Sequence, residues 1–488
     1  MTLHDSELAK TLPEAPSEQE PRRVILDFTD LIGHLARGGG VSGIPRVVFE
    51  FGNVASALAR DQNIDFQFGL FDQARDAYLQ LEPPQADGAN SRTLDWLLSE
   101  PIFRRGYSRP IDLAKINSKY AGRPIRRRLH TAYGRSRLAR RRLASRVLGA
   151  LGLRADFSEI RFRAGDVLLM LGSGWAATPF LDHIEPLQNA GVIAPVILIH
   201  DLIPFLHLDN DDSIPAAIFE PWLERVAKTG CRFLTVSEAT KSDLSTYLAD
   251  KKIDTPPIHV TRLPHEFSTP LPKPLEPEIQ AIIASNYALF VGPVSGRKNA
   301  KRLLEAWARV LPRAGPEKMP RLVITSGRGA EDIYESHIRP IETHVRLLRR
   351  PDDFALSELY RHAAFTIFPS LHEGWGLPVG ESLWHGTPCI TSDRSSMPEV
   401  GGELCDYVDP TSVDSIADAV ARFALDGDYR DGRAAAVRRA KLRTWTDFAG
   451  DVLDVALHRA QAGADNFQEH NHHRQGASTN LATVIGAL

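Results

Sequence analysis

The sequence predicts an α/β fold made of two Rossmann-like, doubly wound domains that face each other across a cleft. Apolar runs of strand length alternate with helical segments in both halves of the chain, which is the pattern of parallel sheets covered by helices. The length of 488 residues fits two or three domains. A proline-rich run at residues 270–278 separates the two alternating series and is typical of a linker.

The first half, residues 22–270, is expected to form the N-terminal domain. Its predicted strands cover residues 24–31, 64–71, 166–172, 192–201, 231–237 and 258–264. A glycine-rich turn at 38–46 follows the first strand and leads into a helix that ends near Arg60. Residues 82–165 interrupt this alternation, and we interpret them as an insertion.

The second half, residues 279–440, is expected to form the C-terminal domain. Its predicted strands cover residues 287–292, 321–327, 364–370 and 388–393. Its predicted helical stretches cover residues 298–311, 330–344, 376–386, 412–426 and 432–461. The last part, 441–461, is expected to pack back on the N-terminal domain. The polar tails 1–21 and 462–488 are expected to be disordered.

Composition and charge exclude several classes of protein. The net charge of −3, with 43% hydrophobic and 24% charged residues, excludes a polycation, a wholly disordered chain and a collagen-like chain. The three cysteines are far apart and lack a zinc-ligand spacing, as expected in a reducing compartment. The N-terminus has no apolar signal-peptide core, and the most apolar stretch, 192–208, is broken by polar residues and prolines. We therefore expect a cytoplasmic protein.

The strongest functional motif, HEGWGLPVGE at 372–381, follows a predicted strand and begins a helix. Gly374 and Gly376 let backbone N–H groups approach a ligand, and a helix N-terminus favours an anion such as a diphosphate. Glu373 and Glu381 are separated by about two helical turns, so they can contact different parts of one ligand. The alternative is an ordinary helix start with a solvated glutamate.

A second strand-to-helix turn, GPVSGRKN at 292–299, begins the second alternating series. Its adjacent cations Arg297 and Lys298 can clamp a phosphate through charge-assisted hydrogen bonds. Taken alone, such a pair is more often two solvated cations on a turn.

The two motifs together, in this order and about 75 residues apart, resemble the retaining, nucleotide-sugar-dependent glycosyltransferases of family 4, which have the GT-B fold. The stretch GTPCITSDRSSMPEVGGELCDYVDP at 386–410 extends the resemblance. In the first half, GIPR at 43–46, IHDLIP at 199–204 and TVSEATKSDL at 235–244 are similar to segments of the same family. The resemblance covers roughly residues 22–461, apart from the insertion.

The resemblance implies a role for each matching residue. Arg297 and Lys298 would hold the donor diphosphate and stabilise the leaving nucleotide, because cations oppose the negative charge that develops there. Glu381 would accept hydrogen bonds from the donor ribose, and Glu373 would lie near the hydroxyls of the transferred sugar. The other residues implied in donor binding are Gly43, Gly374, Trp375, Gly376, Leu377, Ser326 and Leu348.

His200 ends a predicted strand and, by the resemblance, would reach the sugar from across the cleft. The alternative is a hydrogen-bonded structural histidine. The candidates for catalysis are His200, Glu373, Arg297 and Lys298. The predicted acceptor loop contains Gly40, Ser42 and Arg46.

No metal or other cofactor is expected, because two cations and a helix N-terminus would stabilise the leaving group. The triplet Asp209-Asn210-Asp211 resembles the DxD metal motif of the other glycosyltransferase fold. It lies in a hydrophilic loop instead of at a strand end, so a metal there is the less favoured alternative.

The insertion is rich in arginine, and Asp112 is its only acid between Arg104 and Arg154. Leucines and a valine occur at roughly helical spacing within 126–130 and 137–154. This pattern predicts a basic amphipathic helix on an anionic membrane surface. A solvated helix or a disordered loop is the alternative. Nucleic-acid binding is not expected, because no aromatic stacking pattern accompanies the arginines.

These observations predict a metal-independent, retaining glycosyltransferase that moves a hexose from a nucleotide diphosphate sugar to a polysaccharide or lipid-linked oligosaccharide. The motifs look most like the mannosyl- and rhamnosyl-transferring members, so the expected donor is GDP-mannose. One alternative is a nucleotide-sugar 2-epimerase of the same fold, which needs no acceptor. The other is a non-catalytic glycan-binding protein, against which the charged motif residues argue.

Overall fold

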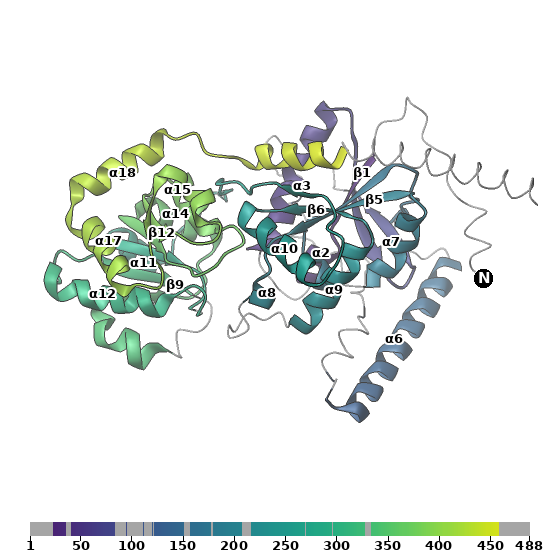
Figure 1. Ribbon diagram of the computed structural model, residues 1–488, viewed down its shortest axis with the longest axis horizontal. Helices are drawn as coiled ribbons and strands as arrows, with labels where there is room; N and C mark the ends of the chain where they lie inside the picture. Colours follow the sequence, from purple (N-terminus) through teal and green to yellow (C-terminus); the bar gives the residue numbers. More distant parts are fainter. Residues whose placement is uncertain are drawn as a thin grey trace, which may run out of the picture.

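The computed structural model describes residues 23–35, 41–82, 122–150, 157–176, 179–206, 216–268, 270–294, 296–326 and 333–457, together with Leu94, Ile111 and Tyr120. Two α/β domains lie side by side, each built on one sheet (Figure 1). The chain passes from the N-terminal to the C-terminal domain after β7 and returns after α18. The predicted pair of doubly wound domains is confirmed.

Within the described ranges, the N-terminal sheet has seven strands in the order β3-β2-β1-β4-β5-β6-β7. They are β1 (Arg23–Asp27), β2 (Asp65–Asp72), β3 (Ala77–Leu81), β4 (Asp166–Met170), β5 (Ile193–Ile199), β6 (Arg232–Thr235) and β7 (Ile258–Val260). All neighbouring strands are parallel except β2 and β3, which form an antiparallel pair. In β1, Val24 and Leu26 join one apolar cluster and Ile25 joins another, because the strand is buried on both faces.

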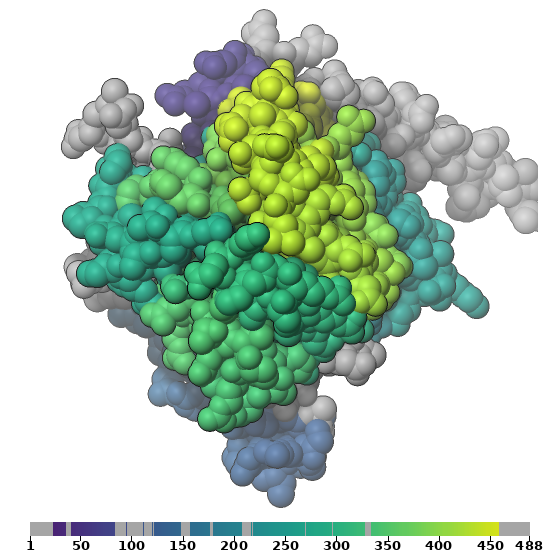
Figure 2. Space-filling view, turned by 90° about the vertical axis from the view of Figure 1, so that its left-hand side faces the viewer, coloured from purple at the N-terminus to yellow at the C-terminus, as the bar shows by residue number. Residues whose placement is uncertain are grey.

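The described helices of this domain cover both faces of the sheet. They are α2 (Thr29–Leu35), α3 (Ile44–Asp61), α6 (Pro124–Ala150), the short 3-10 turn η2 (Gly174–Ala176), α7 (Pro179–Asn189), α8 (Ile203–Leu206), α9 (Ala216–Lys228) and α10 (Glu238–Asp250). Helix α6 belongs to the insertion and lies at the edge of the molecule in both views (Figures 1 and 2). None of the helices that the structure describes is long and apolar enough to cross a bilayer.

The C-terminal sheet is parallel throughout its described strands, in the order β10-β9-β8-β11-β12-β13. They are β8 (Tyr287–Val291), β9 (Arg321–Thr325), β10 (Val345–Leu348), β11 (Phe365–Phe368), β12 (Cys389–Ser392) and β13 (Cys405–Val408). The helical elements are α11 (Pro277–Ile283), α12 (Ala300–Ala314), η3 (Tyr334–Ile338), η4 (Arg339–His344), α14 (Asp353–His362), α15 (Leu377–Trp384), α16 (Met397–Gly401), η5 (Gly402–Leu404), α17 (Val413–Leu425) and α18 (Gly427–Arg439).

Three predicted elements differ from the structure. The helical stretch expected at 432–461 is broken, since α18 ends at Arg439 and the next helix begins at Trp445. The strand expected at 24–31 ends at Asp27, because the Asp27 carboxylate accepts the N–H of Thr29 at 2.9 Å and starts helix α2. The helix expected at 330–344 is irregular in its described part, 334–344. There a π-helical and a 3-10 segment meet around Ile341, whose backbone is not helical.

A last helix, residues 445–457, packs on the N-terminal domain (Figure 1). The buried ring of Phe448 contacts Phe51 of α3 edge-on, with centroids 5.9 Å apart. The Arg232 guanidinium donates to the carbonyl oxygen of Val455. The N–H of Trp445 donates to Glu266 at 2.7 Å. The helix therefore ties the end of the described chain to the first domain.

Phe448→Ala should lower the free energy of unfolding by about 3–5 kcal/mol, because it removes a fully buried ring from this contact. Chemical denaturation followed by circular dichroism measures the change. Leu425→Ala, at a leucine that is 49% exposed, is the control and should change stability by less than about 0.5 kcal/mol. Equal midpoints for Phe448→Ala and the parent chain would contradict this account of the helix.

Candidate active site

Two strand-to-helix turns of the C-terminal domain lie side by side, because their strands β8 and β11 are neighbours in the sheet. The first turn carries Arg297 and Lys298 before α12, and the second carries Glu373 before α15. The Leu371 N–H donates to the carbonyl oxygen of Arg297 at 2.9 Å. The Asn299 side-chain amide donates to the carbonyl oxygen of Pro369 at 2.9 Å. These bonds hold the two turns together.

Glu373 joins both predicted cations. Its Oε2 lies 2.6 Å from Arg297 Nη1, and its Oε1 lies 2.5 Å from Lys298 Nζ. Burial alone would raise the pKa of Glu373, but the charges of Lys298 and Arg297 outweigh it and lower the pKa to about 2. The three side chains thus form a compact charged cluster with one net positive charge. The positive end of α15 points at the same place.

The backbone of the second turn is held closely. Gly376 caps α15 with φ of 103°, a left-handed conformation that favours glycine. A Cβ on Gly374 would lie 1.9 Å from the carbonyl oxygen of His200, in the N-terminal domain. The Ser396 hydroxyl lies 3.0 Å from the carbonyl oxygen of Glu373 and 2.8 Å from that of Trp375. The turn is therefore pressed against the facing domain, and only glycine fits at 374.

His200 is the first residue after β5, and its ring is buried in the N-terminal domain. Its Nε2 lies 2.8 Å from the carbonyl oxygen of Leu171, so Nε2 carries the proton and the ring is tied to its own domain. Burial lowers the pKa of His200 to about 4, so the ring is neutral near pH 7. The structure brings the His200 backbone, by its carbonyl group, against the turn at Gly374.

Asp201 follows His200 and shares the electrostatic environment of the charged cluster. Burial raises the pKa of Asp201 to about 6, while the charge of Arg297 acts in the opposite direction and that of Glu373 adds to the rise. Its Oδ1 accepts the N–H of Ile203 at 3.1 Å. Asp201 is thus an acid on the facing domain that lies within the influence of the predicted diphosphate site.

The N-terminus of α10 makes a further contact between the domains. The Ser237 hydroxyl donates to the carbonyl oxygen of Gly374 at 2.7 Å, and the Thr240 hydroxyl lies 3.2 Å from the same oxygen. The carboxylate of Glu399, from α16, accepts the N–H groups of Glu238 and Ala239, each at 2.9 Å. A carboxylate of one domain therefore caps a helix of the other.

Arg46 of the N-terminal domain bridges to Glu381, the last residue of the HEGWGLPVGE motif in the C-terminal domain. Its Nη1 lies 2.8 Å from Glu381 Oε1, and its Nη2 lies 2.8 Å from Asp353 Oδ1. The guanidinium carbon also lies 4.7 Å from the centre of the Phe267 ring. The Tyr360 hydroxyl donates to the other oxygen of Glu381 at 2.8 Å. Arg46 and Glu381 are therefore both buried and both hydrogen-bonded.

The glycine turn before α3 is described in part. Gly43 has φ of 62° and caps the helix, with no heavy atom within 4 Å of a Cβ built there. Ser42 is exposed. Gly40 lies outside the described residues, as do Asp209 and Asp211 of the predicted alternative metal motif.

Four predicted donor residues contribute chiefly to packing in this structure. The side chains of Trp375 and Leu348 are buried in the apolar core, and Leu377 packs against it. Ser326 is also buried. Its N–H donates to the carbonyl oxygen of Leu348 at 3.0 Å, so these two residues meet at the carboxyl ends of β9 and β10.

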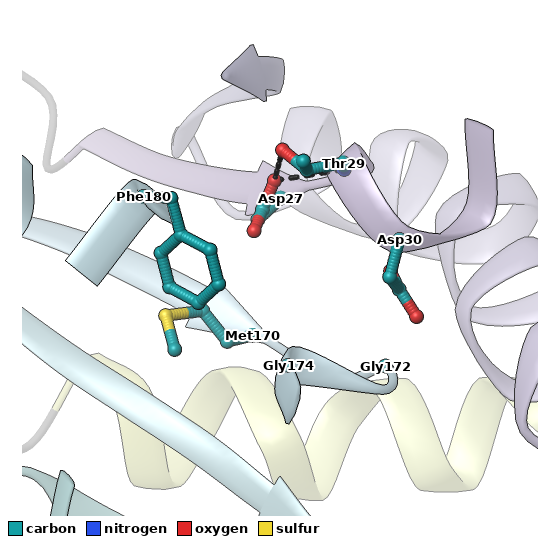
Figure 3. A pocket seen from close by; sticks show the side chains of 7 residues that line it. All are labelled: Asp27, Thr29, Asp30, Met170, Gly172, Gly174 and Phe180. Atoms are coloured by element: carbon teal, nitrogen blue, oxygen red, sulfur yellow. Dashed lines mark hydrogen bonds between the residues drawn. The ribbon is translucent and has the colours of Figure 1, made fainter. Parts of the chain in front are cut away.

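A small cavity lies in the N-terminal domain, where β1 and β4 end (Figure 3). Its lining residues are Asp27, Thr29, Asp30, Met170, Gly172, Gly174 and Phe180. Ligands of open α/β sheets bind outside the carboxyl ends of the strands, which is where this cavity is found. Burial raises the pKa of Asp27 to about 7, although two hydrogen bonds from Thr29 oppose the rise. Burial also raises the pKa of Asp30.

Sequence reasoning missed several residues at or beside the contact between the domains. Ser237, Thr240, Asp353 and Glu399 bond across it, whereas Asp201 lies next to Gly374 and Tyr360 supports Glu381 within its own domain. Of these, Ser237 carries a readable signal, since a serine directly after a strand and before a helix is a common N-cap. The others are ordinary polar residues in helices or loops, and the inter-domain partners of Thr240, Asp353 and Glu399 appear only when the two domains meet.

The titration of Asp27 should make the protein less stable as the pH rises from about 4 to about 7. In this window the folded chain retains a proton that the unfolded chain has released, so ionisation favours unfolding. Asp27→Asn should remove up to about 1.4 kcal/mol per pH unit of this dependence. Denaturant midpoints measured for both proteins across the window test this. Parallel curves for the two proteins would show that Asp27 does not titrate as described.

Comparison with known proteins places the chain in a family. Residues 276–442 match the family described as "Glycosyl transferases group 1". The chain is 31% identical over 298 residues to O-antigen chain mannosyltransferase B of Escherichia coli, and this alignment covers 58% of this chain and 76% of that protein. It is 30% identical over 239 residues to the MMP alpha-(1->4)-mannosyltransferase of Mycolicibacterium hassiacum, covering 48% of this chain and 55% of that protein.

Solved structures share the fold. Sucrose-phosphate synthase from Thermosynechococcus elongatus aligns with a TM-score of 0.53 at 15% identity, over 90% of this chain and 100% of that one. The alpha,alpha-trehalose 6-phosphate synthase of Burkholderia multivorans aligns with a TM-score of 0.51 at 14% identity, over 92% and 99%. Both likenesses concern the fold, which is GT-B. Together with the paired turns described above, the similarities establish that the chain belongs to the group 1 glycosyltransferases and is a glycosyltransferase enzyme with the GT-B fold.

Proposed function

We propose that this glycosyltransferase transfers mannose from GDP-mannose, with retention at the anomeric carbon, to a polysaccharide or lipid-linked oligosaccharide in cell-surface glycan biosynthesis. The observation that carries the proposal is the cluster of Arg297, Lys298 and Glu373 at the N-terminus of α15. The choice of mannose is supported by the names of two relatives, both mannosyltransferases. The O-antigen relative supports a cell-surface glycan as acceptor.

Arg297 and Lys298 are proposed to hold the donor diphosphate. In this structure Glu373 forms ion pairs with both cations, and diphosphate oxygens can accept the same hydrogen bonds. Each charge-assisted bond contributes about 1.5–3 kcal/mol. Displaced from the cations, the Glu373 carboxylate becomes an acceptor for sugar hydroxyls. One carboxylate would thus couple diphosphate binding to sugar binding.

Glu381 is proposed to accept the ribose hydroxyls of the donor. Its two oxygens already accept from Arg46 and Tyr360, but a carboxylate has about four acceptor sites, so a ribose can add to these bonds. Arg46 would then orient Glu381 without touching the reacting atoms. Asp353, at the start of α14, holds the second nitrogen of Arg46.

Retention is proposed to follow from attack on the same face as the leaving group. The acceptor oxygen bonds to the anomeric carbon, the bond from that carbon to the diphosphate breaks, and the hydroxyl proton passes to the departing phosphate. Neither polar candidate is suited to be a nucleophile. His200 is buried with a pKa of about 4, so its ring is a weak base, and the pKa of Glu373 of about 2 makes that carboxylate a weak base and a weak nucleophile.

No metal is required in this scheme, because Arg297, Lys298 and the helix N-terminus stabilise the charge that develops on the diphosphate. We also propose that the enzyme works in the cytoplasm, at the inner face of the cell membrane. The basic segment 104–154 would bring it to anionic lipid, where a lipid-linked acceptor is found.

Arg297→Ala and Lys298→Ala should each lower kcat/KM for GDP-mannose by at least about tenfold, because each removes one charged bond to the diphosphate. Steady-state transfer assays in the presence of EDTA measure this and test metal independence together. Arg309→Ala, on the outer face of the same helix α12, should retain full activity. Full activity in both cation variants, or an epimerised nucleotide sugar formed without acceptor, would contradict the proposal.

Arg46→Ala should raise the donor KM by about tenfold with a smaller change in kcat, since Glu381 loses the group that orients it. Arg46→Lys keeps the charge but cannot bond both carboxylates in a fixed fork, so an intermediate KM is expected. Thermal shift on adding GDP-mannose provides an independent measure of binding. An unchanged KM in Arg46→Ala would show that Glu381 does not depend on this bridge.

A further inference from the structure

Helix α6 has one face turned to the protein. Its partly or fully buried side chains recur with the three- and four-residue spacing of a single helix face. They are Thr131, Gly134, Leu138, Arg141 and Ser145. This face accounts for how the helix rests on the rest of the molecule.

The opposite face of α6 is apolar and exposed. Its large side chains are Ile125 (75% exposed), Leu129 (64%), Tyr133 (60%), Leu143 (63%) and Val147 (48%). At about 100° per residue they lie within an arc of roughly 80°, on the side of the helix away from the buried face. These five are half of the exposed large apolar side chains reported for the described residues. An exposed apolar stripe of this length needs a partner.

Arginines border the stripe on both sides. Helix α6 contains nine arginines and no acidic residue. Arg126 and Arg137 lie along one border, Arg128, Arg135 and Arg146 lie toward the other, and Arg140 lies within the stripe between Tyr133 and Leu143, all exposed. The surface therefore consists of two apolar patches, Ile125 to Tyr133 and Leu143 to Val147, with cations at their edges and one arginine between them.

We infer that α6 lies in the plane of an anionic lipid surface, with the stripe from Ile125 to Val147 inserted at the boundary of headgroups and acyl chains. The bordering arginines would contact lipid phosphates. A nucleic acid offers phosphates but nothing to cover the stripe, whereas a lipid surface offers both. This inference deepens the proposed membrane contact and does not depend on the identity of the donor.

The inference also orients the enzyme. Because the stripe faces away from the side of α6 that is turned to the protein, the N-terminal domain would sit directly above the membrane. Helix α6 lies at one end of the N-terminal domain, on the side away from the C-terminal domain (Figure 1), and at the lower edge of the molecule when seen from the C-terminal domain (Figure 2). A membrane-bound acceptor would then approach the N-terminal domain first.

Flotation of the full chain with vesicles of equimolar phosphatidylcholine and phosphatidylglycerol separates insertion from simple charge attraction. Leu143→Ser/Val147→Ser should weaken partitioning by at least about tenfold. Arg128→Ala/Arg135→Ala should also weaken it by about tenfold or more, most clearly at low salt. The matched control Leu271→Ser/Leu425→Ser changes two exposed leucines elsewhere (82% and 49%) and should bind like the parent chain.

A fluorescence measurement reports the position of the stripe directly. The cysteines at 231, 389 and 405 are buried, so an environment-sensitive thiol dye will label a new exposed cysteine selectively. The dye on Leu143→Cys should shift to shorter wavelength with the anionic vesicles and not with pure phosphatidylcholine. The dye on Leu271→Cys should shift with neither.

The outcomes distinguish this inference from the proposals on which it rests. If the serine variant floats like the parent while the arginine variant does not, insertion is wrong and the membrane contact stands. If the parent chain does not float, both are wrong. The chain could also form a dimer in the absence of lipid. If Leu143→Ser/Val147→Ser disrupts such a dimer, the stripe binds a second copy of the chain and the inference is overturned. Transfer to a soluble acceptor should be unchanged in all variants, which tests the glycosyltransferase proposal separately.

Discussion

The close approach of the turn at residues 373–376 to the N-terminal domain constrains the whole site. Gly374 lies so near the carbonyl oxygen of His200 that no side chain can be added, and its own carbonyl oxygen accepts from Ser237. The contact therefore joins the facing domain directly to the turn that begins α15 and carries Glu373. Glycine is required at 374 for reasons of space, whereas at 376 the left-handed backbone also favours it.

Charge is distributed around this contact so that each buried ion has an opposite partner. Glu373 lies between two cations of its own domain, whereas Glu381 takes its cation, Arg46, from the facing domain. The first cluster can keep its geometry if the domains separate, and the second cannot. Breaking either pair would leave a buried charge uncompensated, which is strongly unfavourable. The two glutamates of one motif thus differ: the ion pairs of Glu373 lie within one domain, whereas the ion pair of Glu381 joins both domains.

The charged site and the exposed face of α6 lie on different parts of the fold. The charged site is formed where strand ends of two sheets meet, while α6 is an insertion between β3 and β4 at the edge of the first domain. This separation would let the insertion bind a surface, as proposed, without disturbing the contacts between the domains. The whole chain is nearly neutral although α6 is strongly basic, because the acidic residues that offset the arginines of α6 lie outside this helix.

The sequence by itself determined the two alternating α/β series, the two strand-to-helix turns and the basic insertion. Each is a local property, written in periodicity, in glycines at turns and in runs of charge. Through the resemblance of its motifs it also indicated Arg297, Lys298 and Glu373 as site residues, but not that Glu373 lies between the two cations. Only the tertiary structure decided the partners of Glu381, the tether of His200 to Leu171 and the capping of α10 by Glu399. These depend on how one domain rests on the other, a relation between distant segments that no local pattern encodes.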